Sequence, residues 1–265
     1  MMFIDQTEKH RAAGRICSAV DLQLAAGYLC SFENIVAVTA NACSVMTTTG
    51  AYRGVHVSQD TDLRNRGLRL YVHNSGLTEA TVSPVDHASR LPPSIVFQER
   101  GGRVVHRSYM TSVCDELALD FLQMSLPACG PQADAKDARP FPVRGSRPLP
   151  LKTVDRQVIP HLLTYLTALR MPLTIAVCSG TCTHCDDGAL DDVHRDGDLL
   201  FVRSGATALS FDPASIGSWR VRSELDIIRL EAVSPGGDEL FYLTAGHRNH
   251  CNATESWSEI LASLP

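Results

Sequence analysis

The chain has 265 residues, of which 44% are hydrophobic and 20% are charged, and its formal net charge is −5. This composition is typical of a folded globular protein with one large domain or two ordinary ones, and it excludes a disordered chain. The negative charge gives no overall attraction to nucleic acid or to anionic lipid, so neither is an expected partner.

The amino-terminal stretch MMFIDQTEKHRAAGR has no apolar core of the kind that a signal peptide needs. No apolar run approaches the roughly 18 residues that span a bilayer. We therefore expect a cytoplasmic protein, in which nine cysteines, an odd number, favour free thiols over a disulfide framework. Four of them stand among apolar or small residues and are expected to be buried: Cys17, Cys30, Cys43 and Cys114.

The first half contains three recognisable elements in chain order. Residues 38–55, VTANACSVMTTTGAYRGV, begin as a strand and cross a Thr-rich stretch to Gly50. Residues 94–110 place a Gly-Gly pair between two alternating apolar segments, which predicts two strands and a tight turn. Residues 115–127, DELALDFLQMSLP, predict a helix that ends at proline.

The same order returns in the second half. Residues 176–193, AVCSGTCTHCDDGALDDV, align without gaps on residues 38–55, at an offset of 138 positions. Residues 229–245 again place a Gly-Gly pair between apolar segments, at an offset of 135 positions. Residues 254–265, TESWSEILASLP, predict a closing helix with the same Ser-Leu-Pro end. The shared order and spacing indicate an internal duplication.

The duplication defines the expected fold class and domains. We predict an α+β fold of two structural repeats, each an extended antiparallel β-sheet with flanking helices, packed about a pseudo-twofold axis. The first repeat takes residues 1–128 and the second takes residues 152–265. Residues 129–151 are rich in Pro, Gly and charge, and they predict a linker.

Three thiols in the second repeat have the spacing of a metal centre. Cys178, Cys182 and Cys185 form CxxxCxxC, which can hold three corners of an iron–sulfur cluster, as in radical S-adenosylmethionine enzymes. A zinc site could instead use these thiols with His184, or the HRNHC run at residues 247–251. Both metal centres are kept as an alternative hypothesis.

The expected strand pattern argues against a metal centre that uses all three thiols. On one continuous strand Cys182, His184 and Cys178 would share a face, and Cys185 would point to the other. Only 80 residues follow the motif, too few for the barrel of a radical enzyme. We therefore favour structural cysteines on or near a strand.

Several segments taken in order resemble one protein family. TTTGAYRGVHV, GLRLYVHNSG and SIVFQERGGRVVHRSYMT in the first half, with MPLTIAVCSGTCTHCDDG and LTAGHRNHCNATESWSEILASLP in the second, resemble the HemS/ChuS haem-utilisation proteins. The resemblance covers roughly residues 12–127 and 155–265. It implies haem as ligand or substrate, a role in hemin transport and iron acquisition, and, in some members, opening of the porphyrin with an external reductant.

The resemblance also suggests where haem could bind. The family's iron-binding histidine lies in a helical stretch between the halves that is missing here, so His161 is at best a displaced candidate. His184 and Arg248 fall on a histidine and an arginine of the family's motifs, and Arg53 matches an arginine at a strand end. The candidate haem-binding residues, taken together, are His247, His184, Arg248, His161, Tyr242, His73 and Arg53.

The leading hypothesis is a cytoplasmic haem carrier or store, with haem degradation as an open question. A haem-delivering transporter or a haem oxygenase is the expected protein partner, and a homodimer is an open option. The alternatives are an interaction scaffold that keeps the duplicated fold without haem, and the zinc or iron–sulfur protein described above. No hydrolase elbow, phosphate loop or HExxH motif competes with these hypotheses.

Overall fold

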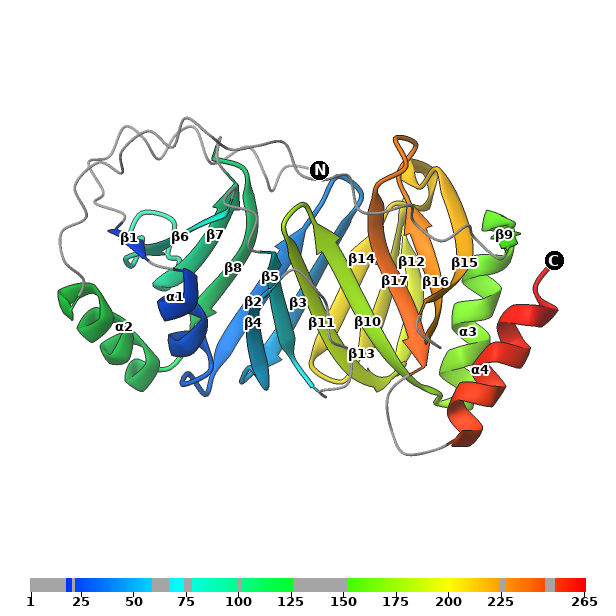
Figure 1. Cartoon of the computed structure of the whole chain (residues 1–265), viewed down its shortest axis with the longest axis horizontal. Coiled ribbons are helices and arrows are strands. Elements are labelled where there is room, and N and C mark those ends of the chain that lie inside the picture. Colours follow the sequence, from blue (N-terminus) through cyan, green and yellow to red (C-terminus); the bar gives the residue numbers. More distant parts are fainter. Residues whose placement is uncertain are drawn as a thin grey trace.

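Two large β-sheets carry the chain, and helices lie at both ends of the molecule (Figure 1). The structure is a computed structural model that describes residues 18–20, 22–58, 67–73, 78–99, 102–125, 152–224, 227–245 and 251–265.

Sheet A has nine strands within these residues. Their spatial order is β1 (Ser18–Val20), β6 (Thr78–Ser83), β7 (Ser94–Glu99), β8 (Val104–Met110), β2 (Ile35–Ala40), β3 (Ser44–Gly50), β14 (Thr207–Phe211), β13 (Leu199–Ser204) and β12 (Asp192–Asp196).

Sheet B has eight strands in the described part of the chain. Their spatial order is β4 (Gly54–Ser58), β5 (Arg69–His73), β11 (Cys182–Ala189), β10 (Pro172–Ser179), β17 (Glu239–Ala245), β16 (Ile227–Val233), β15 (Ser218–Glu224) and β9 (Lys152–Val154). All described strand pairs are antiparallel except β4 with β5, which run parallel. The expected α+β class is confirmed.

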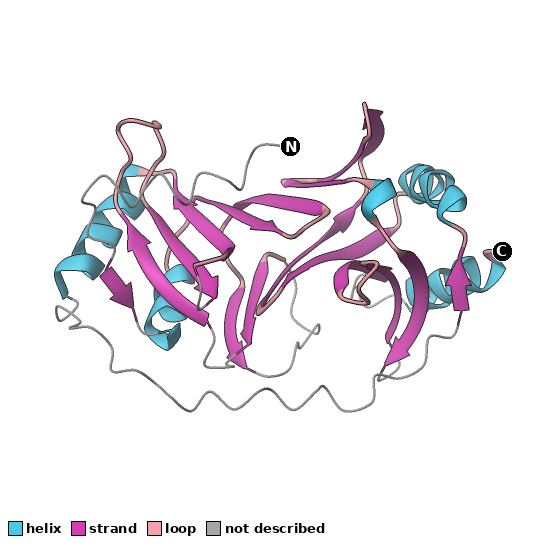
Figure 2. Ribbon diagram, turned by 90° about the horizontal axis from the view of Figure 1, so that it is seen from above, coloured by secondary structure: helices cyan, strands magenta, loops and turns pink. Residues whose placement is uncertain are grey.

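Helices close the two ends of the molecule. α1 (Leu22–Leu29) and α2 (Val113–Ser125) lie at one end, and α3 (Ile159–Leu169) and α4 (Cys251–Ser263) lie at the other (Figures 1 and 2). None of the described helices combines the length and the apolar character needed to cross a bilayer.

Local sequence explains where α3 begins and ends. A short 3-10 turn precedes it, in which the Asp155 carboxylate accepts a hydrogen bond from the Gln157 backbone N–H. Pro160 occupies the first turn, where its missing N–H costs nothing. The helix ends at Arg170 in a left-handed conformation, φ 49°, and Pro172 two residues later cannot continue it. The chain then enters β10.

The duplication is visible in the order of the strands. β2, β3 and β4 of the first repeat correspond to β10, β11 and β12 of the second at the offset of 138 positions. β8 corresponds to β17 at the offset of 135 positions, and each is followed by a helix, α2 or α4. The aligned segments 38–55 and 176–193 are thus matching parts of the two sheets, as the internal repeat predicted.

The repeats exchange strands. β5 belongs to the first repeat but pairs with β11 in sheet B, where Cys185 lies opposite Arg69. β14 belongs to the second repeat but pairs with β3 in sheet A, where Thr207 lies opposite Thr48. Neither sheet is therefore built from one repeat alone, and the division at residues 128 and 152 stays a prediction about the sequence copies.

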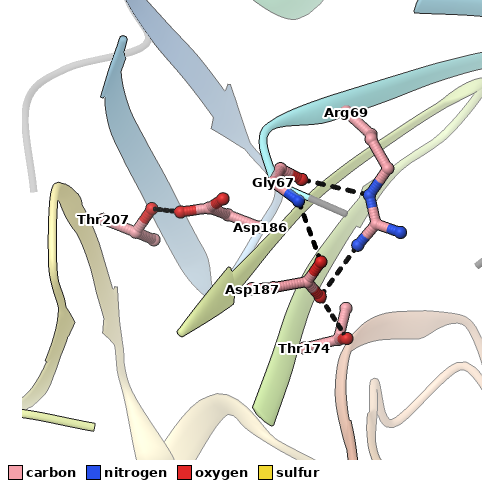
Figure 3. Close-up of polar contacts among 6 residues, drawn as sticks. All are labelled: Gly67, Arg69, Thr174, Asp186, Asp187 and Thr207. Atoms are coloured by element: carbon pink, nitrogen blue, oxygen red, sulfur yellow. Dashed lines mark hydrogen bonds and ion pairs between the residues drawn. The ribbon is translucent and has the colours of Figure 1, made fainter. Parts of the chain in front are cut away.

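Polar side chains join the exchanged strands at their ends (Figure 3). The Arg69 guanidinium forms an ion pair with Asp187 at 2.9 Å, and the Thr174 hydroxyl and the Gly67 backbone N–H donate to the same carboxylate. The Thr207 hydroxyl donates to Asp186 at 2.5 Å. Burial raises the pKa of Asp186, and the Thr207 hydrogen bond opposes this effect. These contacts connect β5, β10, β11 and β14 at the crossing of the two repeats.

We expect Arg69→Ala to destabilise the whole fold. The Arg69 side chain is 0% exposed and that of Asp187 is 17% exposed, so the variant leaves a largely buried carboxylate without its cation. Loss of one partner of such a pair costs about 3 kcal/mol of unfolding free energy. Urea unfolding followed by circular dichroism measures it.

The matched control is Arg103→Ala. Arg103 pairs with Glu99 at 2.8 Å, but its side chain is 55% exposed. Removal of this pair should cost under about 1 kcal/mol. Equal losses in the two variants would contradict the structural importance of the Arg69–Asp187 pair.

Candidate functional site

Sheet B has two chemically different faces. Residues directly opposite each other on neighbouring strands share a face. One face continues the apolar core, with Ile175, Val177 and Phe241 packed among residues of α3, α4 and sheet A. The other face, called here the outer face of sheet B, carries a row of different character: Arg69, Cys185, Ala176, Tyr242, Glu231 and Arg220. Figure 1 shows β10, β11 and β17 in front of β13 and β14.

The centre of the outer face is a small aromatic cluster. Tyr71, Ala176, Cys185 and Tyr242 form a buried group that is separate from both large cores, with Cys178 and Ile227 packed at its side. No helical residue of the described chain belongs to this cluster. His56 stacks on Tyr71 with ring centroids 5.0 Å apart and 18° between the planes. The centre of the outer face is therefore a buried floor of aromatic and small side chains.

Charged groups surround this floor. The Arg229 guanidinium lies 4.7 Å from the centroid of the Tyr242 ring. Glu231, directly opposite Tyr242, is paired with Arg222 at 3.0 Å. The Cys178 thiol donates to the Glu239 carboxylate at 3.3 Å. Two of the neighbouring carboxylates are thus engaged, and Arg229 places a cation over the phenol ring.

Burial keeps the protons on the titratable groups of the floor. It raises the pKa of the Tyr242 phenol well above its usual range, although the Arg229 cation opposes this effect. It raises the pKa of the Cys185 thiol to about 12, with Arg69 again opposing. The pKa of the Cys178 thiol is raised by burial and by the neighbouring Glu239 carboxylate. These thiols are not activated nucleophiles.

The three thiols of CxxxCxxC do not meet. A tight turn at Gly180, φ 53°, separates β10 from β11, so the segment is a hairpin and not one strand. Cys178 and Cys185 consequently share the outer face, while Cys182 lies on the core face. The expectation that Cys178 joins Cys182 was wrong, because the turn reverses the chain between them. Nowhere in the described residues do three or more His, Cys, Asp or Glu side chains gather as a metal site.

Two other thiols differ from expectation. Cys43 is buried, as expected, but Cys30 and Cys114 are exposed. Cys30 follows the last residue of α1, and Cys114 lies in the first turn of α2, so both thiols lie at helix ends. Cys17 lies outside the described residues.

His184 faces the core and not the outer face. It is 0% exposed, and its Nδ1 is hydrogen-bonded to the Thr39 hydroxyl at 3.1 Å. Thr39 also bonds His106 at 2.6 Å, and His106 bonds the Tyr52 hydroxyl at 2.6 Å. Ser108 completes this inter-sheet network through Tyr52 at 2.9 Å. A ligand on the outer face cannot reach His184.

The inter-sheet network joins side chains of both repeats, and it has no polar counterpart at the equivalent positions. The positions equivalent to its members in the other copy are apolar and belong to one large core: Val177, Leu190, Phe241, Leu243 and Met46. Burial lowers the pKa of His184 to about 3, and burial together with His184 lowers the pKa of His106 well below its usual value. Both imidazoles are therefore neutral in the folded protein, and they specify the contact between the sheets.

The other candidate residues lie in three places. Tyr242 and His73 are on the outer face, where the His73 backbone N–H donates to Thr181 at 2.8 Å. His161 is exposed on α3 and lines, with Tyr165, an open groove of about 480 Å³ between α3 and α4. Arg53 is exposed beside Gly67. His247 and Arg248 lie outside the described residues.

Sequence reasoning missed two residues of the outer face, Tyr71 and Arg229. The alternation in RLYVH places Tyr71 on the same face as Arg69 and His73, so that pattern could have identified it. Arg229 had no local signal, because its contact with Tyr242 depends on the pairing of β16 with β17.

Comparison with known proteins shows the fold. No family model matches the sequence, and no curated protein matches it. Among solved structures, the Escherichia coli O157:H7 heme degrading enzyme ChuS matches with a TM-score of 0.73 and 16% sequence identity, over 96% of this chain and 88% of that chain. PhuS, a heme-binding protein from Pseudomonas aeruginosa, matches in its apo and holo forms with a TM-score of 0.74 and 15% identity, over the same shares. The resemblance read from the motifs is thus confirmed for the fold.

The inter-sheet network predicts acid sensitivity. The unfolded chain binds protons on His106 and His184 below about pH 6.5, whereas the folded chain keeps both neutral. Stability is therefore full above that pH and is lost as the pH falls, by about 1.4 kcal/mol per pH unit for each histidine. Urea unfolding at pH 7, 6 and 5 measures the slope.

His184→Met, which installs the residue of the equivalent position in the other repeat, should reduce this slope. The control His161→Ala removes an exposed histidine and should leave the slope unchanged. Identical slopes in wild type and His184→Met would refute the neutral, buried state of His184.

Proposed function

We propose that this chain binds haem on the outer face of sheet B, as an intracellular carrier or store in haem-iron utilisation. The observation that carries the proposal is the aromatic cluster of Tyr71, Ala176, Cys185 and Tyr242, which stands apart from both cores. A haem site needs an apolar surface for the ring, cations for the propionates and a donor for the iron. The outer face offers all three.

The residues divide among these roles. Tyr71, Ala176 and Tyr242 supply the apolar floor. Arg229 supplies a cation at the side of this floor, because its guanidinium lies over the Tyr242 ring. His73 is a further donor on this face, and His247 and Arg248 follow β17 by two and three positions in the sequence. His184, His161 and Arg53 are not assigned to this site.

The solved structures of similar fold support haem as the ligand. PhuS is described as a heme-binding protein, and ChuS as a heme degrading enzyme and a heme oxygenase. The description of ChuS also favours a second candidate function, haem degradation with electrons from an external reductase. We propose a haem-delivering transporter as the protein partner, or a haem oxygenase if the chain is a carrier, and pairing of two chains is compatible with either function.

Titration of the purified chain with hemin tests the proposal. We expect a shifted Soret band that saturates at one haem per chain. Arg229→Glu places a carboxylate where a propionate would approach, so the affinity should fall about tenfold or more. The matched control Arg203→Glu makes the same change at an exposed position of β13 in sheet A and should leave the affinity unchanged.

The titration also separates the alternatives. An unsaturable Soret response would reject haem binding and favour an interaction scaffold with this fold. Saturation with equal losses in Arg229→Glu and Arg203→Glu would move the site away from the outer face. Addition of a reductase to the haem-loaded protein distinguishes the two functions. If the chain is an enzyme, bound haem should be degraded faster than free haem is under the same conditions. If it is a carrier, the rate of haem loss should not increase.

A further inference from the structure

Tyr242 is the side chain on the outer face best suited to hold an iron. It is 1% exposed, and its hydroxyl lies beside the weakly bonding Cys185 thiol and has no hydrogen bond to an oxygen or nitrogen atom of the described residues. A buried phenol without an oxygen or nitrogen partner is uncommon, because its desolvation is then poorly compensated. Such an atom indicates a position that a ligand satisfies.

The imidazoles near this face are less well placed. The His56 ring is stacked on Tyr71, and its Nε2 lies against the backbone of Gly54 on the same strand. A Cβ atom placed on Gly54 would be 2.5 Å from that nitrogen. His73 lies at the end of β5, next to the Thr181 carbonyl. His184 lies on the core face, hydrogen-bonded to Thr39. Tyr242 instead occupies the middle of the cluster, on the strand between β10 and β16.

The charges around Tyr242 favour its phenolate form once a metal replaces the proton. Arg229 lies over the ring at 4.7 Å and attracts negative charge on it. Of the acids that face it, Glu231 is paired with Arg222 and Glu239 accepts from the Cys178 thiol. The neighbouring thiols of Cys178 and Cys185 are neutral, since burial raises the pKa of both, that of Cys185 to about 12.

We infer that Tyr242 is the iron donor of the outer face and that it makes the site selective for ferric haem. This inference rests on the proposed haem binding and deepens it. Phenolate oxygen is a hard anionic donor that suits Fe(III) and holds Fe(II) poorly, whereas imidazole suits both. A carrier built on Tyr242 therefore retains oxidised haem and releases it when the iron is reduced.

The binding step balances without any change of oxidation state. The Tyr242 O–H bond breaks and an Fe(III)–O bond forms. The hydroxide carried by free ferric haem leaves together with the phenol proton as water. An external one-electron reductant, such as dithionite, then adds one electron to the iron, and the phenolate takes a proton from solvent as its bond to the iron breaks.

Two titrations of the full chain test this selectivity. Hemin is the ferric probe, and haem reduced with dithionite in the absence of oxygen is the ferrous probe. We expect wild type to bind the ferric form at least about tenfold more tightly. Resonance Raman spectra of the ferric complex should show the ring modes of an iron-bound tyrosinate. Tyr242→Phe should lose those modes and most of the ferric affinity, while its ferrous affinity stays the same.

Three controls make the outcome specific. Tyr71→Phe makes the same chemical change on the same face and should keep the tyrosinate modes. Cys185→Ala removes the neighbouring thiol and should keep them as well. Tyr242→His supplies a donor that suits both oxidation states, so it should bind ferrous haem more tightly than wild type does.

The results distinguish this inference from the proposed function. Absence of binding to either probe overturns the haem proposal itself. Tight binding without tyrosinate modes in wild type overturns the role of Tyr242 alone, even if Tyr242→Phe fails to fold. Equal affinity of wild type for ferric and ferrous haem overturns the selectivity.

Discussion

The pairing of β5 with β11 and of β14 with β3 is the constraint on which the rest of the structure depends. Each pair joins a strand of one repeat to a sheet of the other, so the backbone hydrogen bonds of either sheet can be completed only when both repeats are present. The Arg69–Asp187 ion pair and the contacts of Thr207 with Thr48 and Asp186 add specific side-chain contacts at the crossing. The duplicated halves therefore stabilise each other through main-chain pairing and buried charge.

The strand exchange also creates the difference between the faces of sheet B. Its core face is covered by α3, α4 and strands of sheet A, and it is apolar. Its outer face receives Tyr71 from the exchanged strand β5 and Tyr242 from β17, and these two residues come from different repeats. The proposed haem site is thus a product of both copies, as is the inter-sheet network of His106 and His184 on the other side.

At equivalent positions, one copy of the repeat has a polar side chain where the other copy has an apolar one. Where the first repeat has Thr39, Tyr52 and His106 around a polar network, the second has Val177, Leu190 and Phe241 in its core. Position 184 reverses this pattern, since His184 of the second repeat corresponds to the apolar Met46 of the first. A network of directional hydrogen bonds fixes the relative placement of the sheets more narrowly than apolar contacts do, which suits a fold whose halves must meet in one register.

The sequence by itself determined the duplication, the hairpins about Gly102 and Gly237, the closing helices and the likeness of the fold to haem-utilisation proteins, because all of these depend on local pattern and order along the chain. Only the tertiary structure decided that Cys178 and Cys182 lie on opposite faces, that His184 is in the core, and that Arg229 covers Tyr242. The turn at Gly180 starts a new strand, so the alternation of faces along β10 does not continue into β11. The pairing of strands that are distant in the sequence decides which side chains contact each other. Neither is determined by spacing along the chain.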